Sequence, residues 1–327
     1  MSYSLGENHI DGQLIEIDRQ RYDSIIRAKN LISAWLDIER LYALCANSYF
    51  EFEKVIIIAG LEYCVGMFSY DQMEDYFEEF HSRLNIRVVT FLNSYKAYCD
   101  QSQRHSTTLE VGFPGISERV QIEFSKSFDS CFEWRVCDAL RNHAQHHNLP
   151  VDGSTFGSRL QQEGDDLETG KPSRWRISSS PYFKVSSLTQ NKHLRSKTRA
   201  ELSDMQFDKI DIKMLLRGFI AELAKCHANL REAFSPHFDE AAAEITEVYA
   251  LVSKAKGCDV KHVSVFDETN ADDPISTYLR LSNIEQCSAY KVRWRGLQTA
   301  QQRFVSSEPV QQDDTFFQTG GDIWISK

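Results

Sequence analysis

The chain has 327 residues, 42% of them hydrophobic and 12% aromatic, so it can bury a sizeable core and wholesale disorder is excluded. Its formal net charge of -10 repels nucleic acid on average, so any contact with nucleic acid requires a local concentration of positive charge. The longest apolar run, residues 55–68, contains Glu62 and is shorter than the roughly 20 residues that cross a bilayer, which excludes a membrane span.

The N-terminal segment and the cysteines both indicate an intracellular protein. The first residues lack the basic start and apolar middle of a secretory signal, so we expect a cytoplasmic location. The eight cysteines are scattered and form no Cys-x-x-Cys pair. We therefore expect buried, reduced thiols and no structural zinc site.

Two long helices are predicted in the first third of the chain. Apolar residues recur at helical spacing over residues 20–61, which predicts one long or kinked amphipathic helix. Asp71 followed by Glu74 resembles a capping box, and the buried stripe that follows predicts a second helix through Tyr95. Residues 99–117 are polar and contain the only Pro-Gly step, so we predict a loop there.

A third helix is predicted over residues 117–147. Its apolar stripe advances in steps of four and consists of Phe124, Phe128, Phe132, Val136 and Leu140. Pro150 and Gly153 end this helix, and residues 151–173 predict an exposed connection. Residues 174–185 are richer in residues that favour strands and predict a hairpin.

The remaining elements are two helices, a short strand and a last helix. The first helix begins near Asp208 and runs to Leu230; the second begins at Ser235-Pro236, a capping residue followed by proline, and ends at Gly257. Residues 260–266 predict a strand and residues 283–304 a helix. The fold class is therefore mainly α, with a small β-hairpin insertion and a C-terminal extension.

Residues 141–146, Arg-Asn-His-Ala-Gln-His, carry the chemically most specific pattern of the chain. Metal-independent RNA cleavage needs a base for the ribose 2′-hydroxyl proton, an acid for the leaving 5′-oxygen, and positive charge on the phosphorus centre. Histidine suits the proton transfers because its unperturbed pKa is about 6.5, and arginine binds phosphate oxygens in pairs. We expect these groups to meet in a turn at the end of the third helix.

The arrangement of Arg141, Asn142 and His146 resembles the Arg-Asn-x-x-x-His signature of the HEPN superfamily, and its helical context is similar over residues 20–256. The resemblance implies a helical bundle that dimerises so that two motifs face one cleft, as in ribonucleases of toxin–antitoxin, phage-defence or RNA-processing systems. Arg141 would bind the scissile phosphate, His146 would act as acid and base, and Asn142 would orient them. His147 is the alternative acid and base. The products would carry 2′,3′-cyclic phosphate and 5′-hydroxyl ends.

A basic stretch could extend the RNA contact. Residues 169–200 contain eight basic residues and no acidic one: Lys171, Arg174, Arg176, Lys184, Lys192, Arg195, Lys197 and Arg199. With Trp175, Tyr182 and Phe183 interleaved, this stretch could follow a phosphate backbone and stack bases. The substrate-binding candidates are His143, Gln145, Lys171, Arg174, Arg176 and Lys184; the alternative is a solvated, charged hairpin.

Two other patterns compete with this interpretation. Arg231 and His237 have a similar spacing, but they lack the adjacent Asn and have Pro236 between them. His143 and His147 lie one helical turn apart and could share a metal with Cys137 or Asp138, but the catalytic Glu of the zinc-protease motif is missing. We expect neither a metal nor another cofactor.

The sequence therefore predicts an endoribonuclease with three regions. Residues 1–257 form a HEPN-like helical domain, residues 151–207 a basic loop and hairpin inserted in it, and residues 258–327 the C-terminal extension. The expected partners are RNA, a second copy of the chain that completes the cleft, and an antitoxin or regulatory protein. The alternatives are a catalytically inactive HEPN-like module that binds RNA or a protein, and a purely structural helical adaptor.

Overall fold

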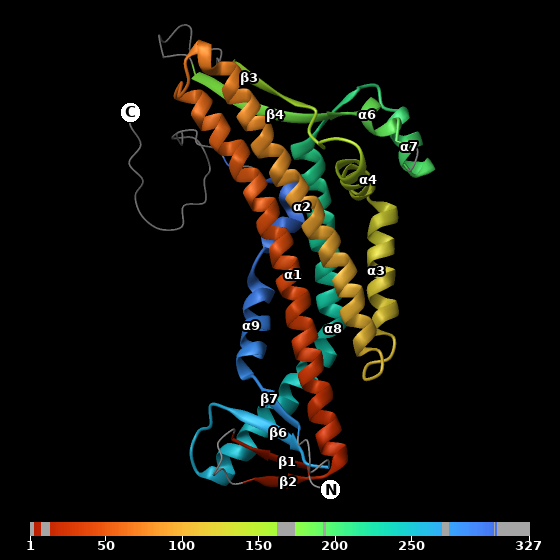
Figure 1. The fold of residues 1–327 in the computed structure, drawn as a ribbon, viewed down its shortest axis with the longest axis vertical. Helices are drawn as coiled ribbons and strands as arrows, with labels where there is room; N and C mark the ends of the chain where they lie inside the picture. The colour runs from red at the N-terminus through yellow and green to blue at the C-terminus, as the bar shows by residue number, and fades with distance from the viewer. Residues whose placement is uncertain are drawn as a thin grey trace.

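The computed structural model describes residues 3–7, 14–161, 174–191, 194–269, 275–303 and 305, the side chains of residues 159–161, 174 and 175 excepted. The described chain is mainly helical with two small antiparallel sheets, which confirms the coarse prediction of the fold class. The molecule is elongated, with one sheet near each end (Figure 1). Among the described residues, no helix combines the length and apolar character that a bilayer crossing requires.

Three long helices form the body: α1 (Arg19–Cys64), α2 (Met73–Leu109) and α8 (Ile212–Lys256), with α1 packed against both others. Asp18 caps α1 by accepting a hydrogen bond of 2.7 Å from the Arg21 amide. The helix predicted over 20–61 is confirmed, and a short 3₁₀ helix, η1 (Tyr70–Gln72), precedes α2. The largest fully buried side chains of the body include Trp35, Phe52, Phe91, Tyr98 and Phe219.

The loop predicted over residues 99–117 is wrong for most of its length, because α2 continues to Leu109. Ser102, Ser106 and Leu109 are buried at helical spacing, and this part of the chain belongs to α2, which packs against α3 (Ile116–Ser130). The chain turns only after Leu109. There the Glu110 carboxylate accepts hydrogen bonds from the amides of Gly115 (2.7 Å) and Ser117 (2.9 Å), and Gly115 has a φ of +86°.

The single helix predicted over 117–147 is two helices, α3 and α4 (Phe132–His146). The helical conformation is interrupted at Cys131, whose backbone is extended. The Cys131 sulfur accepts a hydrogen bond from the Trp134 amide. Arg135 stabilises the break: its guanidinium donates to the carbonyls of Phe128 and Asp129 at the end of α3 and forms a paired contact with Glu201. Apolar periodicity alone could not show this break, because the stripe continues in register across it.

The two helices predicted over 208–257 are one helix, α8, with Pro236 inside it. Proline has no backbone N–H and so removes one helical hydrogen bond, which is why the sequence predicted that a new helix begins at Pro236. Phe234 and Phe238 on either side of it are buried, and their packing keeps the helix continuous. Gly257, with a φ of +71°, ends α8 as predicted.

The sheet near α4 joins β3 (Gly153–Gln161), β4 (Arg174–Lys184) and β5 (Lys209–Asp211) in that order. A hairpin is present, but residues 153–161, predicted as a connection, form one of its strands, and residues 174–184 form the other. Two short helices, α6 (Val185–Thr189) and α7 (Ser196–Ser203), follow β4.

The sheet at the other end joins two N-terminal strands to two strands that follow α8, in the order β2-β1-β6-β7. Its strands are β1 (Tyr3–Gly6), β2 (Ile15–Ile17), β6 (Val263–Asp267) and β7 (Ile275–Leu279). The last predicted helix is divided into α9 (Leu281–Val292) and a 3₁₀ helix, η2 (Arg295–Gln302), where Trp294 has a φ of +62°. β7, in the stretch expected to be a linker, was not predicted.

Residues after Gly257 share the hydrophobic core of the helical body, with Val263, Leu279 and Cys287 fully buried in it. Gly218 of α8 shows how close this packing is. A Cβ at Gly218 would lie 2.7 Å from Cγ of Glu133 on α4 and 2.6 Å from Nε2 of Gln301 on η2. The glycine therefore lets two separate elements approach the same point of α8.

Candidate functional site at the end of α4

The predicted motif occupies the last two turns of α4, where the helix meets the β3–β4 hairpin (Figure 1). Arg141 and Asn142 are half-buried, His143 is buried, and Gln145 and His146 are exposed. The helix ends at the exposed His147. The amides of His147 and Asn148 both donate to the His143 carbonyl, at 2.8 and 3.2 Å.

The expectation that Arg141 and His146 meet in a turn is wrong, because residues 141–146 are all helical. At about 100° per residue, their side chains leave the helix axis about 140° apart. Gln145 lies on the same face as Arg141, and His147 follows His143 by one turn. One copy of α4 therefore points the guanidinium and the His146 imidazole in different directions.

Arg141 is half-buried and has no carboxylate partner among the described residues, a property that it shares with the half-buried Arg87 and Arg199. The Nε atom of Arg141 is buried and makes no hydrogen bond, and within the described part of the chain Arg141 has no ion pair. By contrast, Arg135, Arg217 and Arg231 are paired with Glu201, Glu53 and Glu39. The charge of Arg141 is therefore available to an anionic ligand, since no described side chain neutralises it.

His143 and His147 lie together beyond Arg141, with ring centroids 5.6 Å apart. His143 Nδ1 is buried and makes no hydrogen bond. Burial lowers the pKa of His143, and the neighbouring charge of His147 lowers it further, against the opposing effect of Asp152. His143 is therefore neutral near pH 7 and lines the site as a polar, uncharged group.

The alternative interpretation is a metal ion held by His143 and His147 with Cys137 or Asp138. The surroundings of the two histidines do not supply these further ligands. Cys137 is buried, and burial raises the pKa of its thiol. Asp138 accepts a hydrogen bond of 3.2 Å from the Tyr95 hydroxyl. Over the described ranges, no group of three or more His, Cys, Asp or Glu side chains could hold a metal ion.

The segment after α4 is fixed to α2 through Val151. The buried side chain of Asn85 accepts a hydrogen bond of 3.0 Å from the Val151 amide and donates to its carbonyl at 3.4 Å. His81 Nε2 lies 2.7 Å from the same carbonyl oxygen. Next, Asp152 donates from its amide to the Tyr182 carbonyl (3.0 Å) and accepts from the Lys184 amide (2.6 Å). These bonds hold the end of α4 against the base of the hairpin.

The predicted basic residues do not all lie beside the motif. Lys184 is exposed at the hairpin base, next to Asp152. Arg176 is exposed further along β4, opposite Arg159. Arg174 begins β4, about 33 Å of extended strand from Lys184, and its side chain is not described. Lys171 lies outside the described residues.

Several side chains of the basic stretch have structural contacts instead of facing a groove. Arg199 donates to the carbonyls of Thr189 and Asn191, Lys197 donates to that of Asp129, and Arg195 lies 4.4 Å from the centroid of the Phe128 ring. Phe183 is buried, so it cannot stack on a base, and Lys209 lies over the Tyr182 ring. Lys192 lies outside the described residues, and the side chain of Trp175 is not described. These contacts agree with the alternative of a charged hairpin and loop, and RNA contact by this stretch stays a prediction.

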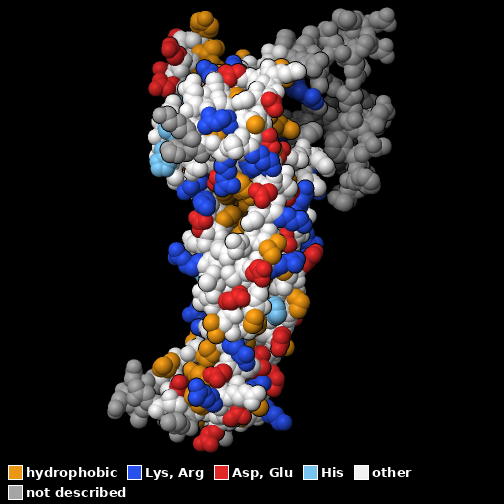
Figure 2. Space-filling model, turned by 90° about the vertical axis from the view of Figure 1, so that its right-hand side faces the viewer, with side chains coloured by type: hydrophobic (Ala, Val, Ile, Leu, Met, Phe, Trp, Pro, Cys, Tyr) orange, Lys and Arg blue, Asp and Glu red, His pale blue; other side chains and the backbone are white. Residues whose placement is uncertain are grey.

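Basic side chains are nevertheless unevenly distributed over the surface. Figure 2 shows Lys and Arg gathered over the upper half of the face that α4, α6 and α7 help to form, with fewer toward the sheet of β1 and β6. Screening at physiological salt limits electrostatic attraction to about 8 Å, so such local charge can attract an anion despite the acidic average. The end of the molecule that contains α4 is therefore the more favourable end for an anionic ligand.

Arg231 and His237, the second Arg–His pair of similar spacing, both have contacts within the helical body. Both nitrogens of Arg231 that face Glu39 are 2.7 Å from its carboxylate oxygens, and His237 packs against the Phe113 ring. Sequence reasoning missed the acidic partner, because Glu39 lies almost 200 residues away in an apolar stripe. The described cysteines are all free, with Cys64 and Cys258 exposed, contrary to the expectation of burial.

Comparisons with protein-family models, with curated proteins and with solved structures found no match to this chain. The resemblance to the HEPN superfamily therefore depends on residues 141–146 and on their helical context.

Proposed function

We propose that the protein is a metal-independent endoribonuclease of the HEPN type, in which Arg141 binds the scissile phosphate and His146 transfers protons. The observation that carries the proposal is the half-buried guanidinium of Arg141, which has no described carboxylate partner and precedes the exposed His146 and His147 at the end of α4. A cation held without a counter-charge has a high affinity for an anion that can displace the remaining water.

The reaction would proceed by attack of the ribose 2′-oxygen on the adjacent phosphorus. A neutral imidazole removes the 2′-hydroxyl proton, the bond from phosphorus to the 5′-oxygen breaks, and an imidazolium protonates that oxygen. Arg141 stabilises the extra negative charge on the phosphoryl oxygens. The products carry a 2′,3′-cyclic phosphate and a 5′-hydroxyl, and no metal is needed.

A second copy of the chain completes this site in our proposal. Because Arg141 and His146 leave one helix about 140° apart, a cleft formed by two α4 ends would supply both groups around one phosphodiester. It would also supply two imidazoles, one as base and one as acid. Gln145, on the face of Arg141, and the neutral His143 would contact the RNA backbone beside the phosphate.

The test is cleavage of bulk RNA by the purified chain in the presence of EDTA, with analysis of the product ends. Arg141→Ala and His146→Ala should each abolish cleavage, and His147→Ala distinguishes the two candidate imidazoles. Arg104→Ala and His105→Ala on α2 are the matched controls, because they remove the same side-chain types away from α4. Cleavage that persists without Arg141 and His146 would exclude this mechanism.

One observation favours a second candidate, a catalytically inactive module that binds RNA or a protein partner. The divergence of Arg141 and His146 within one chain is compatible with anion binding by Arg141 alone. Retained RNA binding without cleavage, lost in Arg141→Ala, would support this alternative. If the chain cleaves RNA in cells, we expect growth arrest that the same substitutions relieve and that an antitoxin or regulatory protein restrains. The cytoplasm is the compartment in which we expect it to act.

A further inference from the structure

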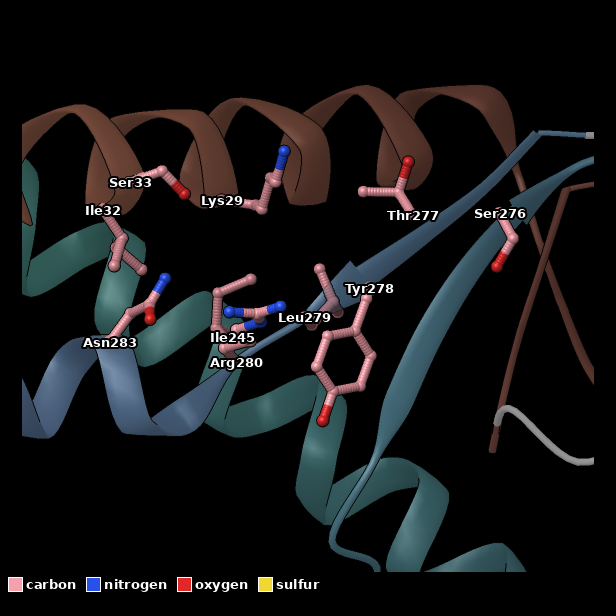
Figure 3. A pocket seen from close by; sticks show the side chains of 10 residues that line it. All are labelled: Lys29, Ile32, Ser33, Ile245, Ser276, Thr277, Tyr278, Leu279, Arg280 and Asn283. Atoms are coloured by element: carbon pink, nitrogen blue, oxygen red, sulfur yellow. The ribbon is translucent and has the colours of Figure 1, made fainter. Parts of the chain in front are cut away.

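A cavity of about 400 Å³ lies at the opposite end of the molecule from α4, between α1, α8, β7 and the start of α9 (Figure 3). Its volume falls within the range of about 300–1,000 Å³ that is usual for small-molecule sites. Its lining consists of Lys29, Ile32, Ser33, Ile245, Ser276, Thr277, Tyr278, Leu279, Arg280 and Asn283. None of these residues belongs to the candidate site on α4.

The lining has positive charge and no negative charge among its described residues. Lys29 on α1 and Arg280 at the start of α9 are its two cations, and no Asp or Glu contributes to it. Hydroxyl groups of Ser33, Ser276 and Thr277 add hydrogen-bond donors. Arg280 is the N-cap of α9, so the positive end of that helix lies on the same side. Such a surface complements an anion.

The apolar part of the lining sets a second requirement on the ligand. Ile32, Ile245 and Leu279 supply the apolar part of the lining, and Figure 3 shows them among the polar side chains of the cavity. A bare inorganic ion would leave this surface and most of the volume unused. The ligand that fits is therefore an organic molecule with an anionic group.

The cavity wall is held in place by contacts outside the lining. The Tyr249 hydroxyl of α8 donates a buried hydrogen bond of 2.8 Å to the Leu279 carbonyl. The Tyr278 hydroxyl is hydrogen-bonded to His262, and the Arg280 guanidinium lies 5.4 Å from the centroid of the Tyr278 ring. Preorganisation of this kind lowers the entropy that binding would otherwise cost.

We propose that this cavity binds a small organic phosphate of about mononucleotide size, with Arg280 and Lys29 as the phosphate contacts. A phosphate offers three acceptor oxygens to two cations and several hydroxyls, which is more than one carboxylate could satisfy. The rest of the cavity then holds the organic part, a sugar or a base.

This site is independent of the proposed ribonuclease site. Gly218 of α8 contacts α4 through Glu133, and Ile245 of the same helix lines the cavity. At about 1.5 Å per residue, 27 residues of α8 separate the two places by about 40 Å. Binding at the cavity can therefore be measured without reference to RNA cleavage, and either proposal can fail alone.

The experiment is isothermal titration of the full chain with the four nucleoside 5′-monophosphates and ribose 5-phosphate, and with adenosine, inorganic phosphate and citrate for comparison. We expect at least one organic phosphate to bind, and adenosine and citrate to bind at least tenfold more weakly. Arg280→Gln and Lys29→Gln should each weaken that binding at least tenfold. The matched control is Arg293→Gln, since Arg293 also lies 5.4 Å from a tyrosine ring, that of Tyr290, but does not line the cavity.

Three results would overturn the proposal. The first is no heat of binding for any organic phosphate at millimolar concentration. The second is equal binding of adenosine or citrate, which would remove the requirement for phosphate. The third is binding that Arg280→Gln leaves unchanged, or that Arg293→Gln weakens equally. Circular dichroism of each variant confirms that a loss of binding is not a loss of fold.

Discussion

Arg231 Nε and Nη2 each lie 2.7 Å from a different carboxylate oxygen of Glu39, a residue with no exposed surface. His227 Nε2 lies 3.2 Å from the same carboxylate, and the Tyr98 hydroxyl lies 2.8 Å from His227 Nδ1. Burial lowers the pKa of His227, so the ring is neutral near pH 7, donating from Nε2 to Glu39 and accepting at Nδ1 from Tyr98. Arg231 also donates to the Tyr290 carbonyl. This network joins α1, α2, α8 and α9.

Removal of Arg231 should therefore destabilise the whole bundle. Arg231→Met leaves the Glu39 carboxylate buried without its main partner, and we expect the free energy of unfolding to fall by about 3–5 kcal/mol. The control is Arg40→Met, which breaks an exposed pair with Asp37 and should cost less than about 1 kcal/mol. Urea denaturation measures both. The double variant Glu39→Leu, Arg231→Met should recover part of the loss; an equal cost for Arg231→Met and Arg40→Met would contradict this role.

The same network predicts how stability depends on acid. Burial alone would raise the pKa of Glu39, but hydrogen bonds and charges from Arg231 and His227 outweigh it and lower the pKa to about 2. Because the folded pKa lies below the unfolded value of about 4.5, the carboxylate contributes stability above pH 4.5 that is lost as pH falls toward 2. At about 1.4 kcal/mol per pKa unit, this is about 3 kcal/mol.

Denaturation in urea at a series of pH values checks this dependence. His227 acts in the same direction, because its lowered pKa lets the unfolded chain bind a proton from about pH 6.5 downward. The variant Glu39→Leu, Arg231→Met, which lacks the carboxylate, should lose less stability than the wild type between pH 4.5 and 2. Parallel pH curves for the two proteins would show that Glu39 does not titrate in this way.

Asn85 should fix the segment that follows α4. Asn85→Leu leaves the amide and carbonyl of Val151 without that partner, at an expected cost of about 1–3 kcal/mol. Amide hydrogen exchange over residues 148–152 should accelerate. Asn93→Leu, at an exposed position of α2, is the control and should change stability by less than about 0.5 kcal/mol. Unchanged exchange in Asn85→Leu would mean that other contacts hold the segment.

Substitution of Arg135 should lower stability, whereas substitution of Arg141, on the same helix, should lower RNA cleavage. Arg135→Ala removes bonds to Glu201 and to the end of α3, so we expect a lower melting temperature. Arg141→Ala removes no described hydrogen bond, so the melting temperature should change little while RNA cleavage is lost. For His146→Ala we expect a rate decrease of about 10²–10⁴, typical of a lost proton-transfer group. A large drop in melting temperature for Arg141→Ala would indicate a structural role instead.

Long apolar periodicity was the feature of the sequence that predicted structure best. The stripe of α1 identified a 46-residue helix with bounds close to those predicted. Local signals for helix ends and loops, such as proline and polar stretches, predicted the structure less reliably. Pro236 did not begin a helix because Phe234 and Phe238 on either side of it are buried. Residues 99–109 did not form a loop because Ser102, Ser106 and Leu109 are buried at helical spacing. In each case tertiary packing outweighed the local preference.

By itself the sequence determined that the chain is mainly helical, and it identified Arg141 and His146 as residues suited to phosphodiester chemistry. Only the tertiary structure decided which arginines already have a carboxylate partner, since Glu39, Glu53 and Glu201 are distant in sequence from the arginines they bind. It also decided the directions of Arg141 and His146 and the position of the cavity beside Arg280. The physical reason is that periodicity is a local property of a helix, whereas charge pairing, burial and cavities arise where separate elements meet.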